Sequence, residues 1–580
     1  DAWKPAVEQV VTELRQALEQ GFAPEEVAEA SKALLARLGQ AADAVAGRPS
    51  LGLAMRIAMT LGRGRQAVAP AAERDLAARL LPGIEPAEVD KALQDLVHLD
   101  RGLILLTLPE TKGADLPTSD ALRAAWKTAL ETPLDPRAKQ AAPGKILAKD
   151  PEPGKVASRT QNADLGVTTL VLENGVRVHV KPLDSVDTVQ VRVRLFGGVP
   201  EETATNRGIT EAAALAFTPG KAATRTLSPT DVSRYLAARE VRVGGGSNNV
   251  SLRLDVRGKA EQLPEGLRLA YLLLTQGKVD TESLAAWRRE TLLQLEEVVD
   301  SVPMQARIGM RRAATGGDVR FALPTKAQIE AIDRETAEAW LDRILTQAPI
   351  EVAIVGRIEP DAAERLARTW FGSLPKRPDR WDATRARRRV EPPEGPIVED
   401  VKVPTVTPLA VVLLGWRGVG RNETDAQLAL VHAATILSSR LLRGVREERG
   451  LTYSIQSGYR FTDYSGLDGL LVRFTADPAK AADAAEVAKK IVLDFAAQGP
   501  TDEELRTVER QFRNQIDTEI QQPGFWISAL DRLHANGRTL EDLAYRLARL
   551  RRIDREAVVK TLNAIVKDKR FARVIAAPGK

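Results

Sequence analysis

The feature that most constrains the fold is a unit of helices followed by a short apolar run, which occurs three times along the chain. Each copy opens with a helix whose first residues include carboxylates, which suit the positive end of the helix dipole. Asp280 and Thr501 are N-cap candidates for the second and third of these helices. These helices begin at 23–27, 280–284 and 501–505. Each copy ends in an apolar run that we expect to form a strand, and these runs lie at 101–109, 350–356 and 570–578. Three copies of one helices-then-strand unit are therefore predicted.

The second and third copies are preceded by strand-like segments, and several of these alternate apolar and polar residues as half-buried strands do. The segments lie at 168–172, 176–182, 189–196 and 250–256 before the second copy, and at 409–416, 451–457 and 469–476 before the third. The fold class that follows is α+β. We expect repeated domains, each with a mixed, largely antiparallel sheet covered by helices.

The first copy lacks such a front half. Only one predicted helix, at 6–20, precedes the helix that opens it, and the chain begins at Asp1 rather than at methionine. We therefore expect a processed or truncated polypeptide. An open sheet edge and an uncovered helix face are costly to leave in water, so another chain or fragment should complete this copy.

The domain layout follows from these copies and from the proline-rich stretches between them. A semi-rigid, proline-rich connector and a shorter arginine-rich linker separate three structured parts. We expect the rear part of a truncated α/β domain at 1–110, the connector at 111–165, a complete domain at 166–385, the linker at 386–396 and a C-terminal domain at 397–580.

Composition excludes several classes of protein and site. A chain of 580 residues is too long for one hydrophobic core, so several domains are expected. Its 83 basic residues are interspersed with 78 acidic ones, which argues against nucleic acid as the partner. The absence of cysteine excludes disulfides and thiolate metal sites, and no apolar run approaches the ~18 residues of a membrane span.

The most distinctive local sequence runs from Ser439 to Tyr453, S-R-L-L-R-G-V-R-E-E-R-G-L-T-Y. It predicts a basic helix that ends at Gly450, followed at once by a strand that starts at Tyr453. Arg446 and Tyr453 are seven residues apart, so a guanidinium and a phenol could face one space and bind a peptide carbonyl or its oxyanion. Solvated arginines at an ordinary helix–strand corner are the simpler alternative.

Four motifs together resemble the pitrilysin/insulinase family of zinc metallopeptidases, the inverzincins. They are L-E-N-G-V-R-V at 172–178, V-G-R-I-E-P-D-A-A-E-R-L from Val355, W-F-G-S-L-P at 370–375, and the arginine-rich segment with its flanking serines at 438–454. The resemblance implies the C-terminal part of a four-domain member, whose domains form a clam shell around a chamber. It also implies that Arg446 and Tyr453 bind the substrate and that Tyr453 supports the transition state.

The chain departs from the family at the inverted zinc motif H-x-x-E-H. Two imidazoles four residues apart on one helix face would hold zinc there, with the glutamate as base. The corresponding helix spans 208–220, and Glu211, Ala214 and Leu215 stand at the positions of the first histidine, the glutamate and the second histidine. Ala214 and Leu215 cannot bind a metal. We expect no catalytic zinc in this chain, and zinc instead in a partner or a missing N-terminal part.

The resemblance therefore predicts the substrate-binding, non-zinc part of a metallopeptidase. It would cleave peptides or unfolded polypeptides together with a subunit or N-terminal fragment that bears H-x-x-E-H, as a heterodimer. The alternative is a catalytically inactive family member that serves as a structural subunit or a peptide-binding protein. Whether the chain is part of an enzyme therefore stays open. Export to the bacterial periplasm or beyond is favoured only because related bacterial enzymes are often exported.

Three other features have simpler explanations. We expect His432, on an apolar helix, to be a core or interface histidine. The segment G-G-G-S-N-N at 244–249 predicts a β-turn beside a strand rather than an anion cradle, although a weak role in binding extended peptides is conceivable. Trp416 and the pair Phe525-Trp526 are expected to fill cores rather than to line the chamber.

Overall fold

The computed structural model describes residues 3–43, 45, 50–107, 116–136, 143–237, 239–420, 423–460, 462–552 and 554–579. These residues divide into two compact units. Unit 1 comprises 1–145 with 233–240, and unit 2 comprises 146–232 with 241–580.

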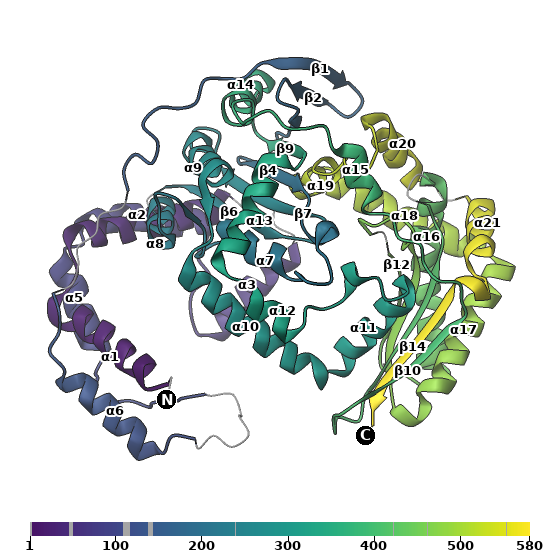
Figure 1. The fold of residues 1–580 in the computed structure, drawn as a ribbon, viewed down its shortest axis with the longest axis horizontal. Coiled ribbons are helices and arrows are strands. Elements are labelled where there is room, and N and C mark those ends of the chain that lie inside the picture. Colours follow the sequence, from purple (N-terminus) through teal and green to yellow (C-terminus); the bar gives the residue numbers. More distant parts are fainter. Residues whose placement is uncertain are drawn as a thin grey trace. The chain divides into compact units, whose positions relative to one another are not determined.

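The regular secondary structure in the described part of unit 1 is helical (Figure 1, purple and blue). Its helices are α1 (Trp3–Gln20), α2 (Pro24–Asp43), α3 (Ser50–Gly62), α4 (Pro70–Leu80), the 3-10 turn η1 (Leu81–Gly83), α5 (Pro86–Leu96) and α6 (Ser119–Glu131). Arg15 ties α1 to α6 by donating to the backbone oxygens of Ala129 and Thr132, at 3.0 and 2.6 Å. The carboxylate of Asp90 accepts the N–H of Phe22 at 3.0 Å and so fixes the turn before α2.

The strand expected at 101–109 is wrong for its described residues, because 101–107 contain no strand and 108–109 lie outside them. A strand needs a neighbour to take its backbone hydrogen bonds, and the described part of unit 1 has none. Leu103 and Leu105 of this segment are 92% and 83% exposed.

Unit 2 is built around two sheets (Figure 1). The seven-stranded sheet has the order β1-β2-β3-β9-β4-β7-β6. Its strands are β1 (Val156–Asn162), β2 (Val167–Leu172), β3 (Arg177–Pro182), β4 (Val189–Phe196), β6 (Val241–Ser247), β7 (Ser251–Gly258) and β9 (Ile350–Gly356). Only β3 and β9 pair in parallel. Two short strands, β5 (Ala223–Thr224) and β8 (Gly277–Lys278), pair separately.

The five-stranded sheet has the order β10-β14-β11-β13-β12. Its strands are β10 (Ile397–Val403), β11 (Ala410–Arg417), β12 (Ile455–Arg460), β13 (Gly469–Ala476) and β14 (Phe571–Pro578). Its parallel pair is β10 with β14, which are its first and last strands along the chain. The same order recurs within the larger sheet as β3-β9-β4-β7-β6, so the two sheets share one topology. This confirms the predicted α+β class with mixed, largely antiparallel sheets.

Most helices of unit 2 follow one sheet or the other along the chain. Those that follow strands of the first sheet along the chain are α7 (Ile209–Ala213), η3 (Ala214–Phe217), α9 (Leu263–Gln276), α10 (Thr281–Val299), α11 (Val302–Thr315), α12 (Lys326–Ala331), α13 (Arg334–Gln347), α14 (Pro360–Trp370) and α15 (Trp381–Ala386), while α8 (Pro229–Ala237) begins in unit 2 and ends in unit 1. Around the second they are α16 (Thr424–Leu441), η5 (Leu442–Glu447), α17 (Ala481–Gln498), α18 (Asp502–Glu519), α19 (Pro523–Leu530), α20 (Leu540–Leu550) and α21 (Arg555–Ile565). The capping predictions hold, since Asp280 caps α10 and Thr501 caps α18.

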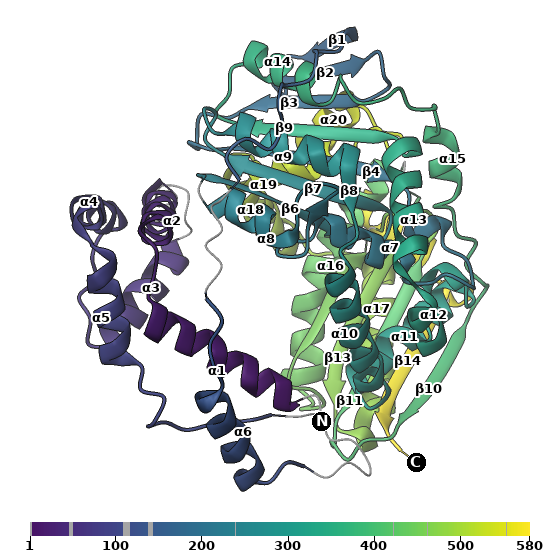
Figure 2. The ribbon, with the colours of Figure 1, turned by 60° about the vertical axis from the view of Figure 1, so that its left-hand side comes forward.

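The two halves of unit 2 exchange helices. Helix α11 follows the first sheet in sequence, yet its Ala306 and Met310 pack against Leu413 and Val574 of the second sheet. Helix α19 follows the second sheet, yet its Trp526 packs with residues of the first sheet. Figures 1 and 2 show α11 beside β10 and β14 in both views. Each sheet is therefore covered in part by the other copy, which burying an apolar face requires.

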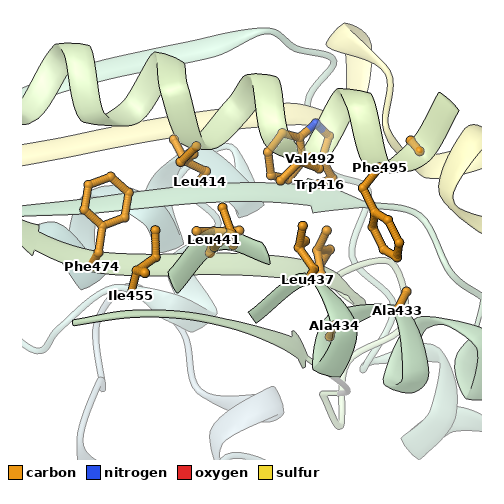
Figure 3. Packing of buried hydrophobic residues seen from close by; sticks show 14 of the residues in the cluster. Leu414, Trp416, Ala433, Ala434, Leu437, Leu441, Ile455, Phe474, Val492 and Phe495 are labelled. Carbon is orange, nitrogen blue, oxygen red and sulfur yellow. The ribbon is translucent and has the colours of Figure 1, made fainter. Parts of the chain in front are cut away.

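The core of the second half lies between its sheet and the helices α16 and α17. Leu414 and Trp416 of β11 lie near Val492 and Phe495 of α17 (Figure 3). Trp416 is 1% exposed, as expected of a core residue. The stretch Thr424–Glu447 is the only helix in the described ranges long and apolar enough to cross a membrane, and 67% of its most apolar window is buried. Its apolar residues here form the core.

The structure differs from the predicted layout in two details. Strand β1 pairs with β2 in the first sheet, although its residues fall inside the predicted connector 111–165. The G-G-G part of 244–249 lies within the edge strand β6, and the bend follows at 249–250. The boundaries 1–110, 166–385 and 397–580 stay a proposal.

Candidate functional site

The candidate site is the corner where α16 ends and β12 begins. Helix α16 continues directly into the π-helical turn η5, in which each hydrogen bond spans one residue more than in an α-helix. Gly450 follows with a φ of 60°, the left-handed conformation predicted for the end of this helix. Its N–H donates to the backbone oxygen of Arg446 at 2.9 Å, and the N–H of Leu451 donates to that of Val445 at 3.0 Å. The sequence therefore located this corner correctly.

The corner is anchored to the sheet by hydroxyl groups. Thr452 Oγ1 donates to the backbone oxygen of Thr475 in β13 at 2.6 Å and accepts the N–H of Ser454 at 3.2 Å. Ser438 Oγ accepts the N–H of Ser457 at 3.0 Å, which joins α16 to β12. These contacts fix the backbone on both sides of Tyr453.

An ion pair holds the C-terminal end of α16, the helix that leads into the corner. Arg440 Nε and Nη2 both donate to the carboxylate of Glu504 at 2.7 Å, which joins α16 to the first turn of α18. The Arg440 side chain lowers the pKa of Glu504 by this hydrogen bond, and the backbone N–H bond adds to the effect. The Arg440 guanidinium also lies 4.6 Å from the ring centroid of Phe495.

The two predicted substrate-binding residues lie on this anchored corner. Arg446 lies in η5 with an exposed side chain, and Tyr453 is 89% exposed. Neither side chain has a hydrogen-bond or ion-pair partner among the residues that the structure describes. Strand β12 starts at Ile455, so the expectation that Tyr453 opens the strand is wrong by two residues. An exposed guanidinium and an exposed phenol are thus available on one corner.

The residues at the zinc-motif positions lie on α7 and η3. Ala214 and Leu215 are 2% and 3% exposed and belong to the core. The Glu211 residue is exposed to solvent. Desolvation by the surrounding protein nevertheless raises the pKa of its carboxyl, and the charges of Glu202 and Glu290 act in the same direction. Within the described ranges, no three residues of the metal-binding types His, Cys, Asp and Glu lie close enough to hold an ion. The side chains at these positions do not fit zinc.

Two of the histidines, His432 and His534, are surrounded by protein rather than placed in a metal site. His432 is 1% exposed, and its ring centroid lies 4.7 Å from that of Phe512. Burial lowers its pKa to about 4. Burial also lowers the pKa of His534 to about 4, with the charge of Arg177 acting in the same direction. His432 is therefore a core histidine, as its apolar helix predicted.

Sequence reasoning missed two buried carboxylates that join the halves of unit 2. Glu351 of β9 accepts the N–H groups of His534 and Ala535, at 2.7 and 3.1 Å. Asp531, which follows α19, accepts from Arg194 Nε of β4 at 2.6 Å. Both carboxylates are fully buried. The one signal in the sequence was an acidic residue within the apolar run 350–356, where a charge needs a specific partner.

Comparisons with known proteins show what the whole chain is similar to. Residues 331–512 match the family model described as the peptidase M16 inactive domain. The chain is 27% identical over 462 residues to an uncharacterized zinc protease of Mycobacterium leprae, covering 76% of this chain and 96% of that protein.

Two solved structures show the same fold. A peptidase M16 inactive domain from Pseudomonas fluorescens has a TM-score of 0.62 at 17% identity, covering 72% of this chain and 99% of that one. The ferredoxin protease FusC, solved as a mutant in complex with Arabidopsis ferredoxin, has a TM-score of 0.68 at 17% identity. That match covers 99% of this chain, and this chain spans 63% of that protein. These matches support a pitrilysin/insulinase-like family member, in which 331–512 correspond to the M16 inactive domain.

Proposed function

We propose that this chain is the substrate-holding, non-zinc part of an M16 metallopeptidase. It would act with a partner subunit or N-terminal fragment that bears the H-x-x-E-H motif, and it would hold peptides or unfolded polypeptides for cleavage. The observation that carries this proposal is the rigidly anchored corner on which Arg446 and Tyr453 are both exposed. An exposed aromatic residue on a fixed backbone favours recognition over packing.

The chemistry of the pair suits a peptide backbone. The Arg446 guanidinium is a permanent cation with several N–H donors, and the Tyr453 hydroxyl can donate one more hydrogen bond. Both can bind a peptide carbonyl, and a donor that remains aimed at the oxygen as charge develops also stabilises the transition state. Tyr453 would thereby support the reaction as a hydrogen-bond donor.

The zinc would belong to the partner. Ala214 and Leu215 are buried and cannot bind a metal, so the zinc would be held by a partner or by a missing N-terminal part. The relatives named as zinc proteases support the reaction class. The ferredoxin complex of FusC supports a protein as the substrate.

Unit 1 supports the need for a partner. Several large apolar side chains of α3 are between 37% and 58% exposed; they are Leu53, Met55, Ile57, Met59 and Leu61. A cavity of about 290 Å³ between α2 and the α4–α5 region has apolar walls that include Phe22, Leu34 and Ile84. Exposed apolar surface of this kind marks interaction sites. We propose that the H-x-x-E-H-bearing polypeptide covers part of it.

A second candidate function has its own supporting observation. The helix at the zinc-motif position is packed into the core and has no catalytic group other than Glu211, which suits an inactive family member. Such a protein would be a structural subunit or a peptide-binding protein. In that role, Arg446 and Tyr453 would hold peptides without any turnover.

Native mass spectrometry combined with zinc analysis, on the protein purified from its own source, separates these functions. A complex that contains a second chain and one zinc supports the peptidase assignment. A 63.1 kDa species that is free of metal and does not cleave an unfolded polypeptide contradicts it and favours the inactive alternative.

A further inference from the structure

One face of the edge strands β12 and β13 carries arginines that the proposed function does not use. In β12, Gln456, Gly458 and Arg460 alternate with residues of the opposite face, and Arg473 of β13 pairs with Gln456. Residues directly opposite each other in an antiparallel pair lie on the same face of the sheet. Arg460 and Arg473 therefore share one face, and both are exposed.

Helix α11 borders this face. Its Met310 packs in one cluster with Leu471 of β13, whose cross-strand partner is Gly458. A Cβ at Gly458 meets no atom within 4 Å, so the space above the middle of β12 is open. Arg307 and Arg311 stand on α11 at the i, i+4 spacing that puts two side chains on the same side of a helix. Arginines of α11, β12 and β13 thus border one open stretch of the sheet, which we call the arginine face.

The arginines of α11 and β12 are close enough to repel one another. Desolvation lowers the pKa of Arg311, and three cations act in the same direction: Arg460, Arg307 and Arg207. Of these, Arg207 is already paired with Glu202 at 2.6 Å. Desolvation also lowers the pKa of Arg460, and the charge of Arg307 adds to the effect. An anion placed among such cations is attracted to all of them.

Ion pairs do not neutralise the arginine face. Within the described ranges, these of its arginines form no ion pair with a carboxylate: Arg307, Arg311, Arg460 and Arg473. Arg311 Nη1 donates instead to the backbone oxygen of Phe321, a neutral acceptor, at 3.2 Å. The charge of Asp468 acts on Arg460, but this carboxylate is buried and also acts on Arg538. The face therefore keeps an excess of positive charge.

The face of β12 suits a partner better than its edge does. Ser438 Oγ of α16 donates to the backbone oxygen of Ser457 and accepts its N–H, both at 3.0 Å, so these groups are not free to pair with another strand. An extended chain repeats every two residues, so acidic residues at alternate positions all point to one side. The whole chain has 83 basic and 78 acidic residues, which argues against nucleic acid as the partner.

We propose that the arginine face binds an acidic segment of an extended polypeptide, whose carboxylates contact Arg307, Arg311 and Arg473. This assignment rests on the proposed function and adds a substrate class to it, namely unfolded polypeptides with segments rich in Asp and Glu. Strand β12 begins two residues after Tyr453, which connects the arginine face directly to the exposed corner.

Fluorescence anisotropy of the full chain with labelled peptides tests the proposal. The peptides alternate serine with Glu, Gln or Lys, so they differ chiefly in charge. We expect saturable binding of the Glu peptide that weakens with added salt, at least tenfold weaker binding of the Gln peptide and no binding of the Lys peptide. Equal binding of the Glu and Gln peptides, or tighter binding of single-stranded DNA with the same number of charges, overturns the proposal.

Two variants locate the binding. The double variant Arg307→Gln/Arg311→Gln leaves no carboxylate unpaired, so it should weaken binding of the Glu peptide at least tenfold while the thermal unfolding midpoint does not fall. Gly458→Glu puts a carboxylate into the open space and should weaken binding in the same way. Arg513→Gln is the matched control, because Arg513 is exposed and already pairs with Glu509. Binding of the Glu peptide that survives both variants contradicts the assignment.

The binding assay needs neither zinc nor turnover, so its failure is distinct from that of the peptidase assignment. A chain that binds the Glu peptide, but whose complex cleaves no unfolded polypeptide, supports the arginine face and contradicts the peptidase assignment. A complex that cleaves acidic and neutral polypeptides equally, with no binding of the Glu peptide, supports the peptidase and contradicts the arginine face.

Discussion

The carboxylate of Glu351, at the centre of the seven-stranded sheet, accepts the backbone N–H of His534 at 2.7 Å, although 183 residues separate the two along the chain. The same carboxylate accepts the N–H of Ala535 and is 2.9 Å from His179 Nε2. The Glu351 carboxylate therefore accepts hydrogen bonds from two backbone N–H groups of a loop in the other half of unit 2. The two halves are joined by a buried polar contact as well as by exchanged helices.

Removing this carboxylate should destabilise the contact between the halves. Glu351→Ala leaves two buried N–H groups without an acceptor, and losing one partner of such a network costs about 3 kcal/mol. Urea unfolding followed by tryptophan fluorescence measures this loss. Glu351→Gln keeps one acceptor oxygen and should cost less. An alanine variant as stable as the wild type would show that solvent or a rearranged loop replaces the carboxylate.

Buried His432 should make the protein less stable as the pH falls. Its pKa is about 4 in the folded state and near 6.5 when unfolded, so the unfolded chain binds the proton first as the pH drops. The stability is complete above pH 6.5 and declines between pH 6.5 and 4. At pH 5 the loss is about 2 kcal/mol. His534 acts in the same direction.

His432→Phe tests this dependence, since the site is apolar and borders Phe512. Urea unfolding at pH 7 and pH 5 should show a smaller difference for the variant than for the wild type. His98 is exposed, so His98→Phe is the matched control and should retain the full difference. Equal pH dependence in wild type and His432→Phe would contradict the assignment.

Local patterns in the sequence predicted much of the fold, because alternation, helix caps and Gly450 act over a few residues. They located the strands around 189–196 and 469–476, the caps of α10 and α18, and the corner before β12. They could not show that α11 covers the second sheet, since an apolar helix face does not name its partner. The run at 101–109 failed for the same reason, because strand formation depends on a neighbour that periodicity does not reveal.

The candidate site likewise combines a turn that the local sequence predicts with contacts that it does not predict. Gly450 predicted the turn from local rules, whereas the assignment of Arg446 and Tyr453 to substrate came from the family resemblance and stays a prediction. The arginine face escaped prediction, because the cations of α11 and β12 meet only in the folded chain. The contact between Glu351 and His534 escaped it for that reason too.

Close packing behind the corner should make Gly444 intolerant of substitution. A Cβ at Gly444 lies 2.7 Å from Cδ1 of Ile491 in α17, so Gly444→Ala forces the Ile491 side chain out of its present position. We expect the free energy of unfolding to fall by about 1 to 2 kcal/mol, although alanine normally favours a helix. Ile491→Val removes the opposing methyl group, so the double variant should recover most of this loss. Gly524→Ala, where a Cβ meets nothing, should instead be neutral or stabilising. Additive effects of the two substitutions would exclude the predicted contact.

Tyr453 should matter for turnover and not for folding. Its side chain is 89% exposed, so Tyr453→Phe should change the free energy of unfolding by less than about 0.5 kcal/mol. If the hydroxyl stabilises the transition state, its loss should lower kcat of the assembled peptidase about 100-fold, with a smaller effect on KM. Cleavage of an unfolded polypeptide by the complex with its zinc-bearing partner is the measurement. Tyr545→Phe is the matched control, because Tyr545 is also exposed but donates to Asp425. A raised KM with unchanged kcat would leave Tyr453 a binding residue only, and unchanged kinetics would remove it from the site.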